Sequence, residues 1–243
     1  MLPHEGTYPI MYGSMPVPVG AGHRTGYVSR PDETGKVPVV FVLPGLEGMG
    51  SFEKDVCRRL ARSGFAALSV DLYGRPGDGL DLYNAMGDDQ ALSIIDELHQ
   101  FVASDDVPWK IDDKVGILAT DVCGRFGIIK AATRDWVRSL ALCYTPLTGD
   151  DDREHEVADY LDHLPVPVLA LYGQDDDLIA VETVDEAQRR NDHGQWLLYE
   201  GAGHGFLDIA GDGYEPAAAE DAWARILAFF RATLPPPEIE DLG

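Results

Sequence analysis

The stretch that decides the fold is KVGILATDVCGRFGIIK, residues 114–130. Its apolar run, residues 115–119, predicts a buried β-strand, and the residues after Gly124 predict a helix. A nucleophile between a strand and a helix stands on a sharp turn that lifts its side chain clear of the sheet. The backbone N–H of the next residue then faces the site from the N-terminal end of the helix. We therefore interpret Cys123 as a nucleophile and the Gly124 N–H as an oxyanion donor.

Two further candidate side chains follow downstream. An acid, Asp176, occurs in the segment GQDD, and a histidine, His204, occurs in the segment GAGHGF. Nucleophile, acid and histidine, in that order, are the chain order of the α/β-hydrolase fold. We expect His204 to be the base for Cys123 and Asp176 to orient it, with Asp175 as the alternative acid.

Strands and helices alternate along most of the chain. Apolar runs predict further strands and apolar spacing predicts helices; the strands are 37–43, 65–70, 139–144, 167–172 and 195–199, and the helices 52–63, 88–104, 157–161, 181–190 and 217–234. This alternation predicts the α/β class, an α/β-hydrolase fold with a mostly parallel central sheet and helices on both faces.

We expect a single α/β-hydrolase domain over residues 1–243, because neither a repeat nor a linker divides the chain. Residues 1–22, rich in Gly and Pro, are expected to wrap the surface, and residues 24–29 to form an edge strand. Residues 76–87 are interpreted as a loop. Residues 235–243 are expected to form a flexible acidic tail, because three prolines stop the last helix.

Ligands of an open parallel sheet bind at the carboxyl ends of its strands. Pro44, Arg75, Cys123, Asp176 and His204 all follow predicted strand ends. Chance would scatter such residues, so their common edge indicates a site. The loop after the strand at residues 37–43 is expected to supply a second oxyanion donor through the backbone N–H of Leu46.

The composition limits the function classes. The 243 residues hold 42 acidic and 19 basic side chains, a formal net charge of −23. Such a surface repels nucleic acid and anionic membranes. No apolar run reaches the about 20 residues that span a bilayer, and the N-terminus lacks the pattern of a signal peptide. Three cysteines at no metal-like spacing favour a reduced, cytoplasmic protein, with Cys57 and Cys143 as buried packing residues.

The chain resembles the dienelactone hydrolase family over about residues 24–234. The motifs DLYGR (71–75), GQDD (173–176) and GHGF (203–206) match the family pattern in order and spacing. The resemblance implies a Cys-His-Asp triad that opens a lactone or ester through a thioester intermediate.

Carried over to this sequence, the resemblance implies that Cys123 is the nucleophile, His204 the base and Asp176 its orienter. It implies that Arg75 binds a carboxylate on the substrate, a small ester or lactone. Neither a metal nor an organic cofactor is needed, and a monomer or a dimer is expected. A second family arginine, just after the catalytic histidine, falls where Asp208 stands.

The turn around Cys123 departs from the family pattern Gly-x-Cys-x-Gly-Gly. With Cys123 as the nucleophile, Asp121, Arg125 and Phe126 replace the three glycines. The opposite charges of Asp121 and Arg125 predict either a salt bridge across the turn or two side chains that reach solvent separately. Family members that open dienelactone also carry a glutamate where Gly45 stands.

Three functions remain open from the sequence. The first is a cysteine hydrolase of a small ester or lactone. The second is a catalytically silent family member that binds a small ligand or a partner in the same cleft, which the substituted turn motivates. The third is a redox-sensing protein that uses the thiol of Cys123.

Overall fold

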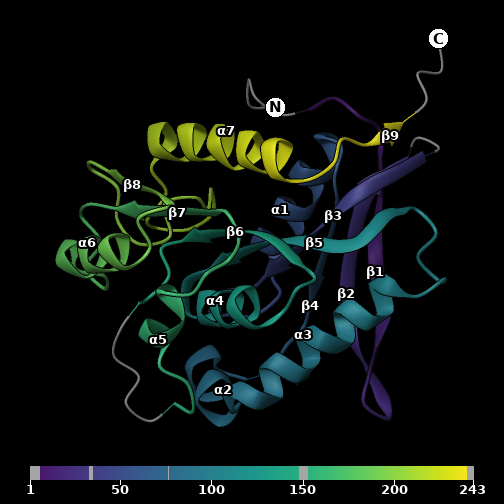
Figure 1. Ribbon diagram of the computed structural model, residues 1–243, viewed down its shortest axis with the longest axis horizontal. Helices are drawn as coiled ribbons and strands as arrows, with labels where there is room; N and C mark the ends of the chain where they lie inside the picture. Colours follow the sequence, from purple (N-terminus) through teal and green to yellow (C-terminus); the bar gives the residue numbers. More distant parts are fainter. Residues whose placement is uncertain (1–5, 33–34, 76, 148–152, 240–243) are drawn as a thin grey trace.

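The computed structural model describes residues 6–32, 35–75, 77–147 and 153–239. Its centre is one sheet in which eight strands follow the order β1-β2-β4-β3-β5-β6-β7-β8, while β9 pairs with β3 (Figure 1). The strands are β1 (Ile10–Val19), β2 (Gly22–Pro31), β3 (Gly35–Leu43), β4 (Ala66–Val70), β5 (Lys110–Thr120), β6 (Val137–Cys143), β7 (Val168–Gly173), β8 (Gln195–Tyr199) and β9 (Glu238–Ile239).

Strands β4, β3, β5, β6, β7 and β8, neighbours in that order, run parallel to one another. The β1–β2 hairpin adds an antiparallel edge beside β4. The helices are α1 (Ser51–Arg62), α2 (Gly79–Ala85), α3 (Asp88–Ala103), α4 (Gly124–Thr133), α5 (Val157–Leu161), α6 (Val181–Arg190) and α7 (Pro216–Thr233). Helices α1 and α7 cover one face of the sheet, and α3 and α4 cover the other (Figure 1). The predicted α/β-hydrolase fold, with a mostly parallel sheet and helices on both faces, is confirmed.

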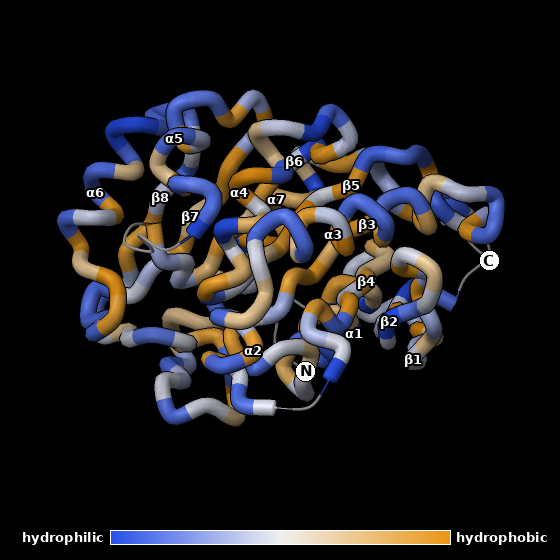
Figure 2. Tube along the Cα trace, turned by 90° about the horizontal axis from the view of Figure 1, so that it is seen from below, coloured by the Kyte–Doolittle hydropathy of each residue, from blue (hydrophilic) through white to orange (hydrophobic). Residues whose placement is uncertain are grey.

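The core lies between the sheet and these two helical layers. Residues Val37–Leu43 of β3 are all buried, as expected of a central parallel strand. Hydrophobic residues gather in the interior of the molecule, and hydrophilic residues dominate its outer helices and loops (Figure 2). The core therefore holds the central strands rigidly, and their carboxyl ends form a firm edge for a site.

Two segments differ from the sequence-based expectation. Residues 10–19 form strand β1 rather than an irregular wrapping segment, so residues 24–29 lie in β2, inside the sheet edge. Pro16 and Pro18 obscured this strand, although an edge strand tolerates proline because one of its sides makes no ladder hydrogen bonds. Residues 79–85, expected as a loop, form α2, capped by the Asp78 carboxylate on two backbone N–H groups.

The C-terminal segment also departs from the expected tail. Helix α7 ends at Thr233, before the three prolines, as predicted. Residues 238–239 then pair antiparallel with β3 instead of fraying. The rest of the tail, residues 240–243, lies outside the described residues, as do residues 1–5 and part of the acidic loop, 148–152.

Candidate active site

Asp121 occupies the sharp turn between strand and helix. Strand β5 ends at Thr120, residues 121–123 make one 3₁₀ turn, and α4 begins at Gly124. The backbone of Asp121 has φ of +52°, a left-handed conformation that few residues other than glycine adopt. Strain of this kind at a strand-to-helix turn marks the residue whose side chain is presented to a ligand. Here that residue is Asp121.

The two carboxylate oxygens of Asp121 have different partners. Oδ1 lies 3.3 Å from Nε2 of His204. Oδ2 accepts a hydrogen bond of 2.8 Å from the backbone N–H of Leu46, in the loop after β3. The carboxyl ends of β3 and β5 and the loop after β8 thus meet at one carboxylate, on the sheet edge that the sequence predicted.

His204 is held between two carboxylates. Its Nδ1 lies 2.9 Å from Oδ2 of Asp176, whose side chain is fully buried. The other oxygen of Asp176 accepts hydrogen bonds from the backbone N–H groups of Leu178 and Ile179. The predicted contact between His204 and Asp176 is present, and the alternative acid, Asp175, is exposed. This arrangement fixes the ring and leaves Nε2 directed at Asp121.

The pKa of His204 reflects these contacts. Burial lowers the pKa of the imidazole, but the hydrogen bond to Asp121 and the charge of Asp176 raise it by more, so the net shift is upward from the ordinary value of 6.5. The ring of Tyr144 packs edge-on against the imidazole, with 5.1 Å between ring centroids. Tyr144 itself has φ of +41° at the end of β6 and was missed by the sequence analysis.

Cys123 does not stand where the sequence analysis placed it. Its side chain is fully buried in the core, and its φ is −77°. Burial, reinforced by the charges of Asp121 and Glu53, raises the pKa of this thiol far above its ordinary value. His204 faces Asp121 instead. The expectation that Cys123 occupies the turn and meets His204 is therefore wrong, because the chain turns two residues earlier.

Gly124 and Arg125 also have other positions than expected. The N–H of Gly124 donates to the carbonyl of Asp121 inside the turn. A Cβ at Gly124 would lie 1.9 Å from Oγ1 of Thr145, so close packing requires this glycine. Arg125 pairs with buried Asp88 at 2.7 Å and not with Asp121. The interpretation of Gly124 as an oxyanion donor and the predicted salt bridge across the turn are both wrong.

A shift of two residues accounts for these differences. When Asp121 is laid on the reactive position of the family pattern, Ala119, Cys123 and Gly124 fall on the three glycine positions. In this alignment small residues occupy the three glycine positions. The alignment on Cys123 had placed Asp121, Arg125 and Phe126 there. The spacing of small residues around Asp121 was therefore visible in the sequence, but the family pattern was aligned on Cys123 instead.

Two side chains hold the loop that carries Leu46. The hydroxyl of Tyr73 donates to the carbonyl of Leu46 at 2.9 Å. The carboxylate of Glu53, on α1, accepts the N–H of Gly50 at 2.7 Å and that of Gly45 at 3.5 Å. Burial raises the pKa of Glu53, while these backbone hydrogen bonds partly offset the shift. The sequence analysis assigned no role to either residue, although Tyr73 lies within the DLYGR motif (71–75).

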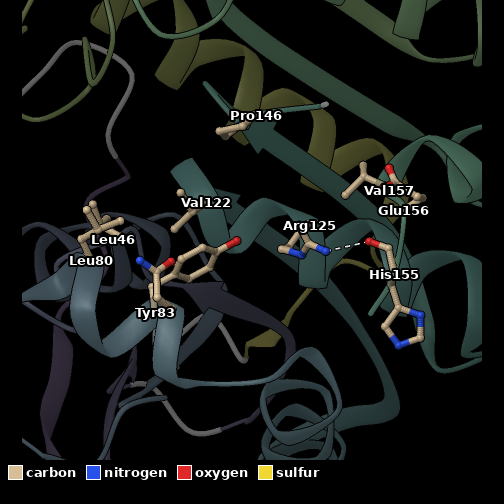
Figure 3. Close-up of a pocket in the computed structure, with 10 residues that line it drawn as sticks. Leu46, Leu80, Tyr83, Val122, Arg125, Pro146, His155, Glu156 and Val157 are labelled. Atoms are coloured by element: carbon tan, nitrogen blue, oxygen red, sulfur yellow. Dashed lines mark hydrogen bonds between the residues drawn. The ribbon is translucent and has the colours of Figure 1, made fainter. Parts of the chain in front are cut away.

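A cavity of about 210 Å³ adjoins the site at Leu46 and Val122 (Figure 3). Leu46, Leu80, Tyr83 and Val122 gather on one side, and Arg125 lies between them and residues 155–157 (Figure 3). The remaining lining residues are Asn84 and Pro146. A mainly apolar hollow with a few polar groups suits a small organic ligand.

Arg75 is not brought to this cavity. Its side chain is exposed and lines a separate hollow with Tyr73, Met86 and Gln90 among others. Its predicted contact with a substrate carboxylate stays a prediction.

The described ranges contain no cluster of three or more His, Cys, Asp or Glu side chains arranged to hold a metal ion. Within the same ranges, no helix is both long enough and apolar enough to cross a membrane. Cys57, Cys123 and Cys143 are all buried free thiols. The burial expected for Cys57 and Cys143 is thus confirmed.

Comparison with known proteins identifies relatives. The model of the dienelactone hydrolase family matches residues 25–234. An Escherichia coli K12 protein, provisionally named carboxymethylenebutenolidase, is 30% identical and covers 91% of this chain and 87% of its own length. A Bradyrhizobium protein, provisionally named 2-oxo-3-(5-oxofuran-2-ylidene)propanoate lactonase, is also 30% identical, over 86% of this chain and 89% of its own.

A solved structure agrees with these matches. A Klebsiella pneumoniae protein, provisionally named a dienelactone hydrolase, aligns with a TM-score of 0.80 at 28% identity, covering 91% of this chain and 98% of its own. The dienelactone hydrolase of Anabaena variabilis shares the fold at 18% identity and a TM-score of 0.72. The chain belongs to the dienelactone hydrolase family.

Proposed function

We propose that the protein is a hydrolase of small esters, lactones or similar compounds, and that its reaction centre is Asp121, His204 and Asp176. In this proposal the nucleophile is the carboxylate of Asp121 rather than the thiol of Cys123. The relatives named as a carboxymethylenebutenolidase and a lactonase support the reaction class. The observation that carries the assignment is the position of Asp121, at positive φ and in contact with both His204 and the Leu46 N–H.

Each group has a role in a two-step hydrolysis. Asp121 attacks the substrate through Oδ1, and the leaving group departs with the electron pair of the broken bond. The covalent intermediate is an ester of Asp121 when the attacked carbon is saturated, and a mixed anhydride when it is a carbonyl carbon. His204, oriented by Asp176, then removes a proton from a water molecule, which attacks Cγ of Asp121. The negative charge that develops on Oδ2 is stabilised by the Leu46 N–H, and the N–H of Val122, next after Asp121, is the expected second donor.

A thioester on Cys123 has less support. A thiolate is the reactive form of cysteine, and burial raises the pKa of this thiol, which disfavours the thiolate. The same burial weakens the redox-sensing hypothesis, since sensor cysteines are accessible and have a low pKa.

A silent ligand-binding protein is the second candidate. One observation favours it: the Leu46 N–H, a donor that a substrate carbonyl would need, already binds Asp121. Turnover distinguishes the two candidates, because a silent member binds a ligand in the cavity beside Leu46 without releasing product.

The cysteines and the net charge bear on the cellular setting. The three buried free thiols suit a reducing compartment, so we propose a cytoplasmic location. The net charge of −23 argues against nucleic acid as a partner.

The test is a set of variants assayed on a panel of short-chain p-nitrophenyl esters and small lactones. We expect Asp121→Asn to lower kcat/KM by about 1,000-fold or more, because it removes the nucleophile. His204→Gln is expected to lower kcat by about 1,000-fold or more, because it removes the base of the second step. Cys123→Ala is expected to retain activity within about threefold, with Cys143→Ala as a matched control for the loss of a buried thiol. Loss of activity in Cys123→Ala, with Asp121→Asn active, would restore the thioester mechanism. Absence of turnover across the panel would favour the silent ligand-binding protein.

A further inference from the structure

The oxyanion donor of the site is directed at the enzyme rather than at a substrate. In acyl transfer, backbone N–H groups must point at the oxygen of the substrate carbonyl. Here the Leu46 N–H lies 2.8 Å from Oδ2 of Asp121. The loop approaches so closely that a Cβ on Gly45 would lie 3.3 Å from Oδ2 and Cβ of Asp121. The carbonyl carbon served by this donor is therefore Cγ of Asp121.

The chemistry of a carboxylate leads to the same conclusion. A carboxylate is a far weaker base than the alkoxide of an alkyl ester, so attack on the carbonyl of an alkyl ester gives an adduct that expels the carboxylate again. Only an activated ester, such as a p-nitrophenyl ester with its weakly basic phenolate, can acylate the carboxylate. Attack on a saturated carbon has no such return path, because the displaced group leaves in the same step. Retaining glycosidases use a carboxylate in this way, forming a covalent bond to a saturated carbon of the sugar.

We propose that Asp121 attacks a saturated carbon that carries a carboxylate or halide leaving group. The substrate class is then a strained lactone opened at its alkyl–oxygen bond, or a small halogenated alkanoate. This inference rests on the proposed function, because it requires Asp121 as the nucleophile.

The atoms and electrons balance in two steps. Oδ1 of Asp121 forms a C–O bond to the substrate carbon, and the electron pair of the broken bond leaves with the carboxylate or halide. His204 takes a proton from water, and the resulting hydroxide attacks Cγ of Asp121. The tetrahedral intermediate, with its charge on Oδ2, expels the alkoxide of the product, which takes the proton from His204. Asp121 is left as the carboxylic acid and releases its proton to solvent, so the sum is R–X plus water giving R–OH plus HX.

The cavity is consistent with this class in size and lining. Its volume of about 210 Å³ admits a molecule of a few carbon atoms. Leu46 and Val122 bring apolar surface to the edge of the site, and such surface excludes water from the carboxylate. A less hydrated carboxylate is a stronger nucleophile toward an alkyl carbon.

The test follows the stereocentre and the oxygen atoms of the product. Single enantiomers of β-butyrolactone and of 2-chloropropionate are incubated with the enzyme in H₂¹⁸O, and the hydroxy acids are analysed by chiral chromatography and mass spectrometry. The Asp121→Asn variant gives the background rate, and p-nitrophenyl acetate serves as a probe that can react only at its acyl group.

We expect inverted configuration from both alkyl probes, with ¹⁸O in the hydroxyl group after many turnovers and in the peptide that contains Asp121. Retained configuration, with ¹⁸O only in the product carboxylate and in Asp121, would overturn the inference but leave Asp121 as the nucleophile. Retained configuration without label in Asp121 would overturn both proposals. Hydrolysis of p-nitrophenyl acetate without turnover of either alkyl probe would overturn the inference, and turnover of none of the three probes would overturn both.

Discussion

The imidazole of His204 lies between two carboxylates, and this contact has consequences for pH. As a base, the ring must be neutral, so hydrolysis of the enzyme ester is expected to increase as pH rises through the raised pKa of His204. The protonated ring is also favoured by folding. Because the pKa is raised in the folded state, the resulting stability is fully present below the unfolded value of 6.5 and is lost as pH rises through the folded pKa.

Removal of the charge of Asp121 is expected to lower the pKa of His204. Asp121→Asn deletes a carboxylate that raises this pKa, while the desolvation that lowers it stays. NMR titration of the His204 ring proton in both proteins measures the change. Asp175→Asn, which removes a neighbouring exposed charge, is the control and is expected to leave the titration nearly unchanged. An unchanged or higher pKa in Asp121→Asn would contradict the contact between the two side chains.

Some site residues were predicted from the sequence and others were missed. Asp176 and His204 follow strand ends within glycine-containing turns, so chain order sufficed to place them. Asp121 was missed because cysteine is the more familiar nucleophile and because a strand's end cannot be read to one residue. Thr120, a β-branched residue, extends β5 by one position beyond the apolar run and places the turn at Asp121.

At the level of elements, the turn between β5 and α4 depends on close packing. A side chain at Gly124 would meet Thr145, two residues beyond the end of β6. We expect Gly124→Ala to lower the free energy of unfolding by about 1–3 kcal/mol, the usual cost of overpacking, and to reduce kcat by displacing Asp121. Chemical denaturation and the ester assay measure both effects.

The matched control for this change is Gly13→Ala in the edge strand β1. A Cβ at Gly13 meets nothing within 4 Å, so its effect is expected to be small. Equal losses of stability in both variants would contradict the packing argument.

The elements missed from the sequence have physical explanations. Strand β1 contains Pro16 and Pro18, and proline usually indicates the end of a strand because it cannot donate a ladder hydrogen bond. At the edge of the sheet one side of the strand needs no such bond, so the prolines are tolerated there. Helix α2 lies in a stretch rich in Gly and Asp, where Asp78 acts as an N-cap rather than as a loop residue. The central strands and the long helices, in contrast, follow from hydrophobic pattern alone, because burial on both faces leaves little room for polar residues.

The whole molecule carries an excess of acidic side chains. The chain has 42 acidic and 19 basic residues. The surface ion pairs among the described residues stabilise the fold by only about 0–1 kcal/mol each, so the repulsion among acidic side chains destabilises it by more than these pairs stabilise it. Salt screens this repulsion over a Debye length of about 10 Å at 0.1 M. We therefore expect Tm to rise when NaCl or KCl is increased from about 0.01 M to about 1 M.

Differential scanning calorimetry at constant pH measures this dependence. Sucrose at matched osmolality serves as a control, because it acts through exclusion from the surface and not through charge. A Tm that falls with either salt would show that the ion pairs outweigh the repulsion.

The central claim, that Asp121 and not Cys123 forms the covalent bond, is tested most directly by the position of the trapped intermediate. In His204→Gln the first step can proceed while hydrolysis of the covalent intermediate is blocked, so substrate accumulates on the nucleophile. After a brief incubation with β-butyrolactone, 2-chloropropionate or p-nitrophenyl acetate, peptide mass spectrometry locates the added mass. The account predicts the added mass on Asp121, both in His204→Gln alone and in His204→Gln combined with Cys123→Ala. An adduct on Cys123 that disappears in Cys123→Ala would contradict it.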